Sequence, residues 1–160
     1  MSEDARFEDA GERPLRLWAQ DADDLVVVSA LVQDAVFPMA EMAWRPAKRQ
    51  FALLINRFRW EDAERAQARQ RPVERVQTVL EVSDVKRVRS QGVDRQDADT
   101  ILSLLSLEWE AGEDGAGTLV LALAGDGAIA LDAECLDVRL TDVTRPYRAP
   151  SGHMPGHDDT

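Results

Sequence analysis

The feature that most constrains the fold is a two-residue alternation of apolar side chains that recurs after residue 50. The alternating segments are 50–60, 76–82, 85–89, 100–110, 118–124 and 128–131, and short polar or glycine-containing segments separate most of them. Alternation with a period of two is typical of half-buried β-strands. Because no helical pattern stands between these segments, the sequence disfavours a parallel α/β sheet and predicts an antiparallel meander.

Helical spacing appears on either side of this run. The first predicted helix begins after the N-cap Asp21 and ends near Ala35, before Pro38. A second helix is predicted after Asp132, and it ends at Pro146. Its apolar stripe is formed by Ala133, Leu136, Leu140 and Val143. We expect further strands at 15–19 and 39–44, a bulge or a bend at 83–84, and an exposed linker or a single helical turn at 61–72.

These elements predict the α+β class. We expect a curved antiparallel β-meander of about seven strands, one helix after the first strand and a C-terminal capping helix. A bent sheet closed by a C-terminal helix is the pleckstrin-homology-like arrangement, which is one candidate and carries no function with it. Residues 15–146 are predicted to form a single domain, and 1–14 and 147–160 to be disordered tails.

The cysteine and histidine content limits the chemistry. Cys135 is the only cysteine, which excludes an internal disulfide framework and a cysteine-rich zinc site, and we expect it to be buried and structural. His153 and His157 are the only histidines, and both lie in the predicted tail. We therefore expect no catalytic constellation, no metal and no cofactor in the folded part. Without a leader pattern or an apolar run of about 20 residues, a cytoplasmic location is predicted.

The charge is unevenly distributed along the chain. The formal net charge is −11, but residues 44–95 carry thirteen Lys or Arg and seven Asp or Glu, a balance of +6, which leaves −17 elsewhere. The negative mean field disfavours nucleic acid as a partner. Opposite charges on one chain favour a protein partner or self-association instead.

The stretch FALLINRFRWE at 51–61 lies inside this basic part. Its alternation predicts that Phe58 and Trp60 point into the core and that Arg57 and Arg59 point to solvent. The candidate surface for an anionic ligand or partner consists of Arg45, Lys48, Arg49, Arg57, Arg59, Arg87 and Arg89. The alternative interpretation is that these side chains pair with the chain's own carboxylates on a solvated face of the sheet.

Several strings resemble the bacterial family known as domain of unknown function 2948. They are LVQDA at 31–35, RQFALLINRFRWE at 49–61, VKRV at 85–88, LLSLEW at 104–109 and AIALDAECLDVRL at 128–140. The resemblance extends over about residues 15–147, and it supports the predicted order of elements. It implies no activity, cofactor or catalytic residue.

We therefore expect a non-enzymatic binding or adaptor domain. One alternative is an enzyme of unfamiliar type that uses Asp, Glu and Arg in a pocket, where convergent groups would have shifted pKa values. A second alternative is binding of RNA or a phosphate ligand through the basic residues of 44–95.

Overall fold

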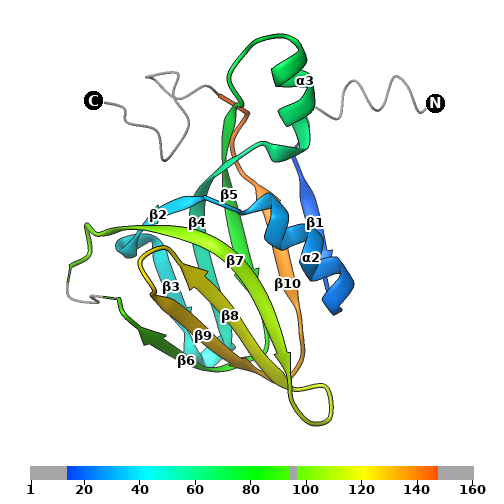
Figure 1. Ribbon diagram of the computed structural model, residues 1–160. Helices are drawn as coiled ribbons and strands as arrows, with labels where there is room; N and C mark the ends of the chain where they lie inside the picture. The colour runs from blue at the N-terminus through cyan, green and yellow to red at the C-terminus, as the bar shows by residue number, and fades with distance from the viewer. Residues whose placement is uncertain (1–13, 94–96, 148–160) are drawn as a thin grey trace.

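The computed structural model describes residues 14–93 and 97–147, over which ten strands form one antiparallel sheet (Figure 1). The strands are β1 (Arg16–Ala19), β2 (Val36–Pro38), β3 (Met42–Arg45), β4 (Gln50–Phe58), β5 (Arg75–Val82), β6 (Val85–Gln91), β7 (Ile101–Ala111), β8 (Gly117–Leu123), β9 (Ala128–Ala133) and β10 (Val138–Asp142). The helices are α2 (Ala22–Leu31) and α3 (Ala63–Ala68), and short 3-10 turns η1 (Met39–Glu41), η2 (Pro46–Lys48) and η3 (Trp60–Asp62) accompany them.

The strand order is β1-β10-β5-β4-β2-β7-β8-β9-β6, and β3 pairs with the first part of β4. Short β2 pairs with both β4 and β7, so it joins two halves of the sheet. We call β1, β10, β5, β4 and β3 the first half, and β7, β8, β9 and β6 the second half. The sheet curls strongly enough that α2 packs against both β1 and β7 (Figure 1).

The chain passes between the halves at Ser83 and Asp84. Val82 ends β5 in the first half, and Val85 begins β6, which pairs with β9 in the second half. Asp84 has a φ of 59°, in the left-handed region that Asp tolerates better than most residues. The predicted bend at 83–84 is therefore confirmed, and it redirects the strand from one half to the other.

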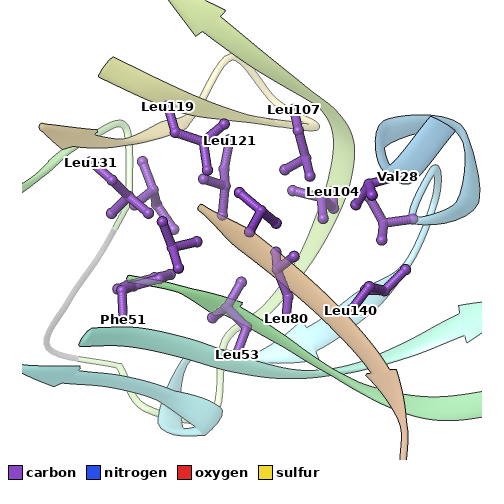
Figure 2. Packing of buried hydrophobic residues seen from close by; sticks show 14 of the residues in the cluster. Val28, Phe51, Leu53, Leu80, Leu104, Leu107, Leu119, Leu121, Leu131 and Leu140 are labelled. Carbon is purple, nitrogen blue, oxygen red and sulfur yellow. The ribbon is translucent and has the colours of Figure 1, made fainter. Parts of the chain in front are cut away.

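The core lies between the two halves. Figure 2 shows Phe51, Leu53 and Leu80 of the first half facing Leu121 and Leu131 of the second half. All five of these side chains have an exposed fraction of 0%. Complete burial of so many large apolar groups supplies the main favourable term in folding.

The predicted α+β class and antiparallel sheet are confirmed, as is a helix after the first strand, which α2 provides with Asp21 as its N-cap. The sheet has ten strands instead of about seven.

The predicted C-terminal helix is wrong, because its residues contain strand β10, which lies between β1 and β5. Val138, Leu140 and Asp142 alternate inward in that strand, and pairing on both sides overrides the weak helical spacing. The pleckstrin-homology-like arrangement rested on that helix.

Two other predictions concern the segment before β5 and the C-terminal tail. Residues 61–72, predicted as a linker or a helical turn, contain the short helix α3. Tyr147, expected in the tail, forms an antiparallel bridge with Arg75. The rest of both predicted tails, except Pro14, lies outside the described residues. Within the described ranges, none of the helices has the length and apolar character needed to cross a membrane.

The core assignment predicts unequal costs for two leucines on neighbouring strands. Leu121 of β8 is fully buried, whereas Leu105 of β7 is 45% exposed. Leu121→Ala is expected to lower the free energy of unfolding by about 2–5 kcal/mol because it leaves a cavity. Leu105→Ala is expected to change it by less than about 0.5 kcal/mol. Urea unfolding followed by circular dichroism measures both, and equal losses would contradict this core.

Candidate binding site

Two of the predicted surface arginines lie in the interior. Arg57 is 0% exposed and Arg59 is 4% exposed, so the prediction that both point to solvent is wrong. Arg57 continues the inward series of Phe51, Leu53 and Ile55 along β4. An arginine on a strand usually faces solvent because burying its charge is costly, but here nearby carboxylates compensate the loss of water. Phe58 is buried as predicted.

Arg57 stands at the centre of a closed cluster of polar groups. Its Nη1 and Nη2 donate to the two carboxylate oxygens of Glu61 at 2.9 Å each. Nη2 also donates to both oxygens of Asp142 at 3.1 Å, and Nε donates to Thr78 Oγ1 at 3.1 Å. Nη1 donates in addition to the Phe58 carbonyl at 2.9 Å. Every guanidinium donor is therefore used inside the protein.

Ionisation in this cluster follows from those contacts. Burial opposes the charge on Arg57, but the hydrogen bonds and negative charges of Glu61 and Asp142 outweigh it and raise the pKa of Arg57. Burial likewise opposes ionisation of Glu61, but hydrogen bonding and the charge of Arg57 lower its pKa below 4.5. Both groups remain charged near neutral pH, which suits a structural ion pair better than an acid–base catalyst.

Arg59 belongs to a second internal cluster, beneath α3. Its Nη1 donates to Glu74 Oε1 at 2.6 Å and lies 3.6 Å from Asp62 Oδ2. Asp62, which is 7% exposed, also accepts a hydrogen bond from Arg71 at 2.8 Å. These contacts join η3 and α3 to the segment before β5. Arg59 is therefore not available to an external ligand.

The other five predicted residues are exposed but lie in two groups. Arg87 and Arg89 on β6 both pair with Asp132 of β9, at 2.9 and 2.6 Å. The hydrogen bond from Arg89 outweighs partial desolvation and, with further hydrogen bonds to the carboxylate, lowers the pKa of Asp132 to about 2. Arg49, beside η2, pairs with Glu134 at 2.6 Å.

Arg45 and Lys48 complete the group at η2. Both are exposed, and neither forms an ion pair within the described ranges. The η2 turn lies beside the start of β6, where the Arg49 carbonyl accepts a hydrogen bond from the Val85 N–H at 2.9 Å. The sequence therefore identified a basic group that the fold does place together at η2.

An apolar pocket lies between the free edges of two strands. Among the residues that the structure describes, β3 pairs only with β4 and β6 pairs only with β9, so each of them has one edge without a described strand partner. The pocket has a volume of about 90 Å³, and it is lined from both edges and from the sheet behind them. Its lining residues are Met42, Trp44, Phe51, Val88, Ser90 and Ile129.

Sequence reasoning did not identify this pocket. Its lining residues are ordinary strand residues, and they meet only because the sheet curls until β3 approaches β6. Trp44 carried one signal, since Trp is enriched at interfaces. The pocket and the neighbouring η2 residues together are the candidate binding site.

Other chemistry-bearing groups are placed elsewhere. Cys135 is exposed instead of buried, and its thiol donates to Asp84 Oδ2 at 3.3 Å. Local desolvation and the surrounding negative charge, chiefly that of Asp84, raise the pKa of this thiol. A thiol with a raised pKa is a poor nucleophile near neutral pH. Across the described residues, no group of three or more His, Cys, Asp or Glu could hold a metal ion.

The fold and these contacts define a small α+β domain with a curled antiparallel sheet and a buried arginine–carboxylate cluster. The chain belongs to DUF2948, a family of proteins of unknown function, whose model matches residues 15–157. The resemblance inferred from the sequence strings is thereby confirmed. No curated protein and no solved structure matches the chain.

The Arg57 cluster predicts a large and partly recoverable loss of stability. Arg57→Met is expected to cost about 3–5 kcal/mol because it leaves the Asp142 carboxylate buried and unpaired. Adding Asp142→Asn to that variant is expected to recover part of the loss. Arg89→Met, on the exposed pair with Asp132, is the control and should cost about 0–1 kcal/mol. Urea unfolding measures all of these variants, and equal costs for the two arginines would contradict a buried cluster.

The lowered pKa of Glu61 predicts acid sensitivity. A carboxylate whose pKa is lower in the folded state stabilises the fold above its unfolded pKa, and that contribution is lost as the pH falls through the folded value. Stability is therefore expected to decline as the pH drops below about 4.5. Glu61→Gln should be less stable at neutral pH and should show a flatter decline in acid. Thermal unfolding across this pH range, with Glu113→Gln as an exposed control, measures the difference.

Proposed function

We propose that this domain is a non-enzymatic binding module that takes an extended, acidic polypeptide segment in the gap between β3 and β6. The observation that carries the proposal is that two strand edges, neither of which has a second strand partner in the described part of the chain, line one apolar pocket. A free edge presents a row of backbone N–H and C=O groups that an added strand can pair with.

The size of the pocket supports a side chain as its occupant. A volume of about 90 Å³ is well below the roughly 300–1,000 Å³ of typical small-molecule sites. It suits one apolar side chain, enclosed by Trp44, Phe51 and Ile129. In an extended segment, the flanking residues would point to the opposite side, toward solvent.

Charge supports an acidic segment. Arg45 at the end of β3 and Lys48 in η2 are exposed, and they have no carboxylate partner among the described residues. An acidic residue beside the bound side chain would supply that partner. Such rim charges act mainly on the association rate and on partner choice, which is the behaviour expected of an adaptor.

The enzyme alternative finds less support. Among the described residues, the set that best fits an enzyme of this kind is Arg57, Glu61 and Asp142. These side chains converge, and the pKa values of Arg57 and Glu61 are shifted. Their contacts are made with one another and with Thr78, and Arg57 has no donor left for a substrate. For binding of RNA or phosphate, Arg57 and Arg59 are not accessible because they are buried, but the exposed basic residues at η2 (Arg45, Lys48 and Arg49) are.

A defined peptide tests the proposal. A fluorescein-labelled peptide that alternates Glu with Val and Leu is expected to bind, as measured by fluorescence anisotropy, whereas the same peptide with Lys in place of Glu is not. Val88→Arg fills the pocket and should weaken binding by about tenfold or more, equivalent to about 1.4 kcal/mol. Arg45→Glu with Lys48→Glu should weaken it similarly. Arg139→Glu with Arg145→Glu carries the same charge change away from the site and serves as the control.

Two outcomes would overturn the proposal. One is equal affinity for the acidic and basic peptides, and the other is unchanged binding by the Val88→Arg variant once circular dichroism shows that it is folded. Mixed-sequence single-stranded RNA is titrated in parallel at low salt. RNA binding that requires Arg45 and Lys48, without peptide binding, would favour the nucleic-acid alternative instead.

A further inference from the structure

We propose that the outer face of the second half of the sheet, formed by β7, β8, β9 and β6, binds a second copy of this chain. These strands are neighbours in the sheet order, and β7, β8 and β9 lie at the front of Figure 1. This surface is distinct from the pocket, because the pocket opens from the inner side of β6 through Val88 and Ser90.

The strand register arranges the outward side chains in three rows. The first row runs Glu110, Thr118, Asp132, Arg87; the second runs Glu108, Val120, Ala130, Arg89; and the third runs Ser106, Ala122, Ala128, Gln91. Each row begins on β7 and ends on β6. The face therefore has an acidic edge, a centre of small side chains and a basic edge.

The centre of this face suits close packing of two sheets. Val120, Ala122, Ala128 and Ala130 are all half-buried, and none of them carries a polar or long side chain. Their inward neighbours, such as Leu121 and Ile129, are fully buried, so these four residues belong to the outer surface. Two sheets that pack face to face approach to about 10 Å, a distance that small residues allow.

The edges carry charge that internal pairing does not neutralise. Arg87 and Arg89 share the single carboxylate of Asp132, which leaves one positive charge in excess, and their side chains are 68% and 49% exposed. Glu108 and Glu110 are exposed on β7, and neither forms an ion pair with a described residue. Each edge thus carries an excess of charge of one sign, and within the chain Glu110 acts on Arg89 only through its more distant charge, without an ion pair.

Only one two-fold arrangement satisfies these charges. Consider a two-fold axis that runs parallel to the strands, between β8 and β9. It places the partner's β7 over β6, and each row then faces the same row of the partner. Glu110 then faces Arg87, and Glu108 faces Arg89, twice in each dimer. An axis perpendicular to the strands would place like charges together, which is unfavourable. The face is therefore self-complementary in the manner of an isologous interface.

The size of the face indicates a weak dimer. Four strands about 4.8 Å apart and three rows about 6.7 Å apart span roughly 400 Å² for each copy. This is about half of the area buried per partner in a standard stable interface. Association should therefore depend on protein concentration and should weaken when salt screens the four interfacial ion pairs.

Charge reversal gives a test that distinguishes this face from others. Sedimentation velocity of the full chain at about 0.15 M salt, where the Debye length is about 8 Å, should show a concentration-dependent dimer that is lost near 1 M salt. Glu108→Lys with Glu110→Lys makes both edges basic, and Arg87→Glu with Arg89→Glu makes both edges acidic. Each variant alone is expected to remain monomeric. A one-to-one mixture should form a heterodimer at least about tenfold more tightly than either variant pairs with itself.

Two further variants keep the test decisive. Glu41→Lys with Glu64→Lys carries the same charge change as the basic variant but lies off the face, and it should dimerise like the unmodified chain. Val120→Lys places a long charged side chain at the centre and should abolish the dimer while the thermal unfolding midpoint is retained. The proposal is overturned if the unmodified chain stays monomeric at the highest concentration. It is also overturned if a dimer survives charge reversal, or if Val120→Lys still dimerises.

Discussion

The buried pairing of Arg57 with Asp142 is the interaction on which the rest of the structure most depends. It joins β4 to β10, and Thr78 of β5 lies between them and donates to Asp142 Oδ1 at 2.7 Å. The other Asp142 oxygen accepts a hydrogen bond from the Leu15 N–H at 2.9 Å, which attaches the chain before β1. A one-residue slip of β10 would turn Asp142 outward. Arg57 would then stay buried but would lose one of its two carboxylate partners. The charge pair therefore fixes a register that apolar packing alone would specify less strictly.

A second constraint is that the sheet curls without closing. Curling buries the leucines of both halves against one another, but the free edges of β3 and β6 remain at its end. Exposed edges invite unselective pairing, and charged residues such as Arg87 and Arg89 on β6 limit it. In the proposed binding mode, the apolar pocket between the edges would add a preference for one kind of side chain. If the proposed binding mode holds, the same few strands would both limit unwanted pairing and select the bound segment.

The sequence predicted the fold correctly where the local pattern and the tertiary context agree. Strands with clear alternation, such as β4, β5 and β8, and the capped helix α2 lie where the pattern placed them. Residues 138–142 do not form the predicted helix. A short apolar segment fits both the helical and the strand period, and pairing with the neighbouring strands β1 and β5 makes it a strand. Arg57 and Arg59 were misplaced for a related reason. Glu61 and Asp62 are close in sequence, but Asp142 and Glu74, which complete the two clusters, are distant, so the local sequence shows only part of the charge compensation.

The candidate site was predictable only in its charged part. Arg45, Lys48 and Arg49 are close in sequence, and one short turn keeps them together. Met42 and Val88 meet at the pocket through the curvature of the whole sheet, which no local pattern records. Sites assembled from distant strands of a curled sheet are therefore harder to find from sequence than sites assembled on one turn.

The place of β10 in the sheet also governs how the chain can fold during synthesis. β4 and β5 can pair soon after both have left the ribosome, but the partner of Leu17 in β1 is Leu140 in β10. Until residue 142 emerges, β1 has no strand neighbour and Arg57 has no buried carboxylate on that side. Contacts across such a separation form slowly because a long loop must close first. The first half of the sheet can therefore be completed only after all strands of the second half have emerged, although its own strands begin earlier in the chain.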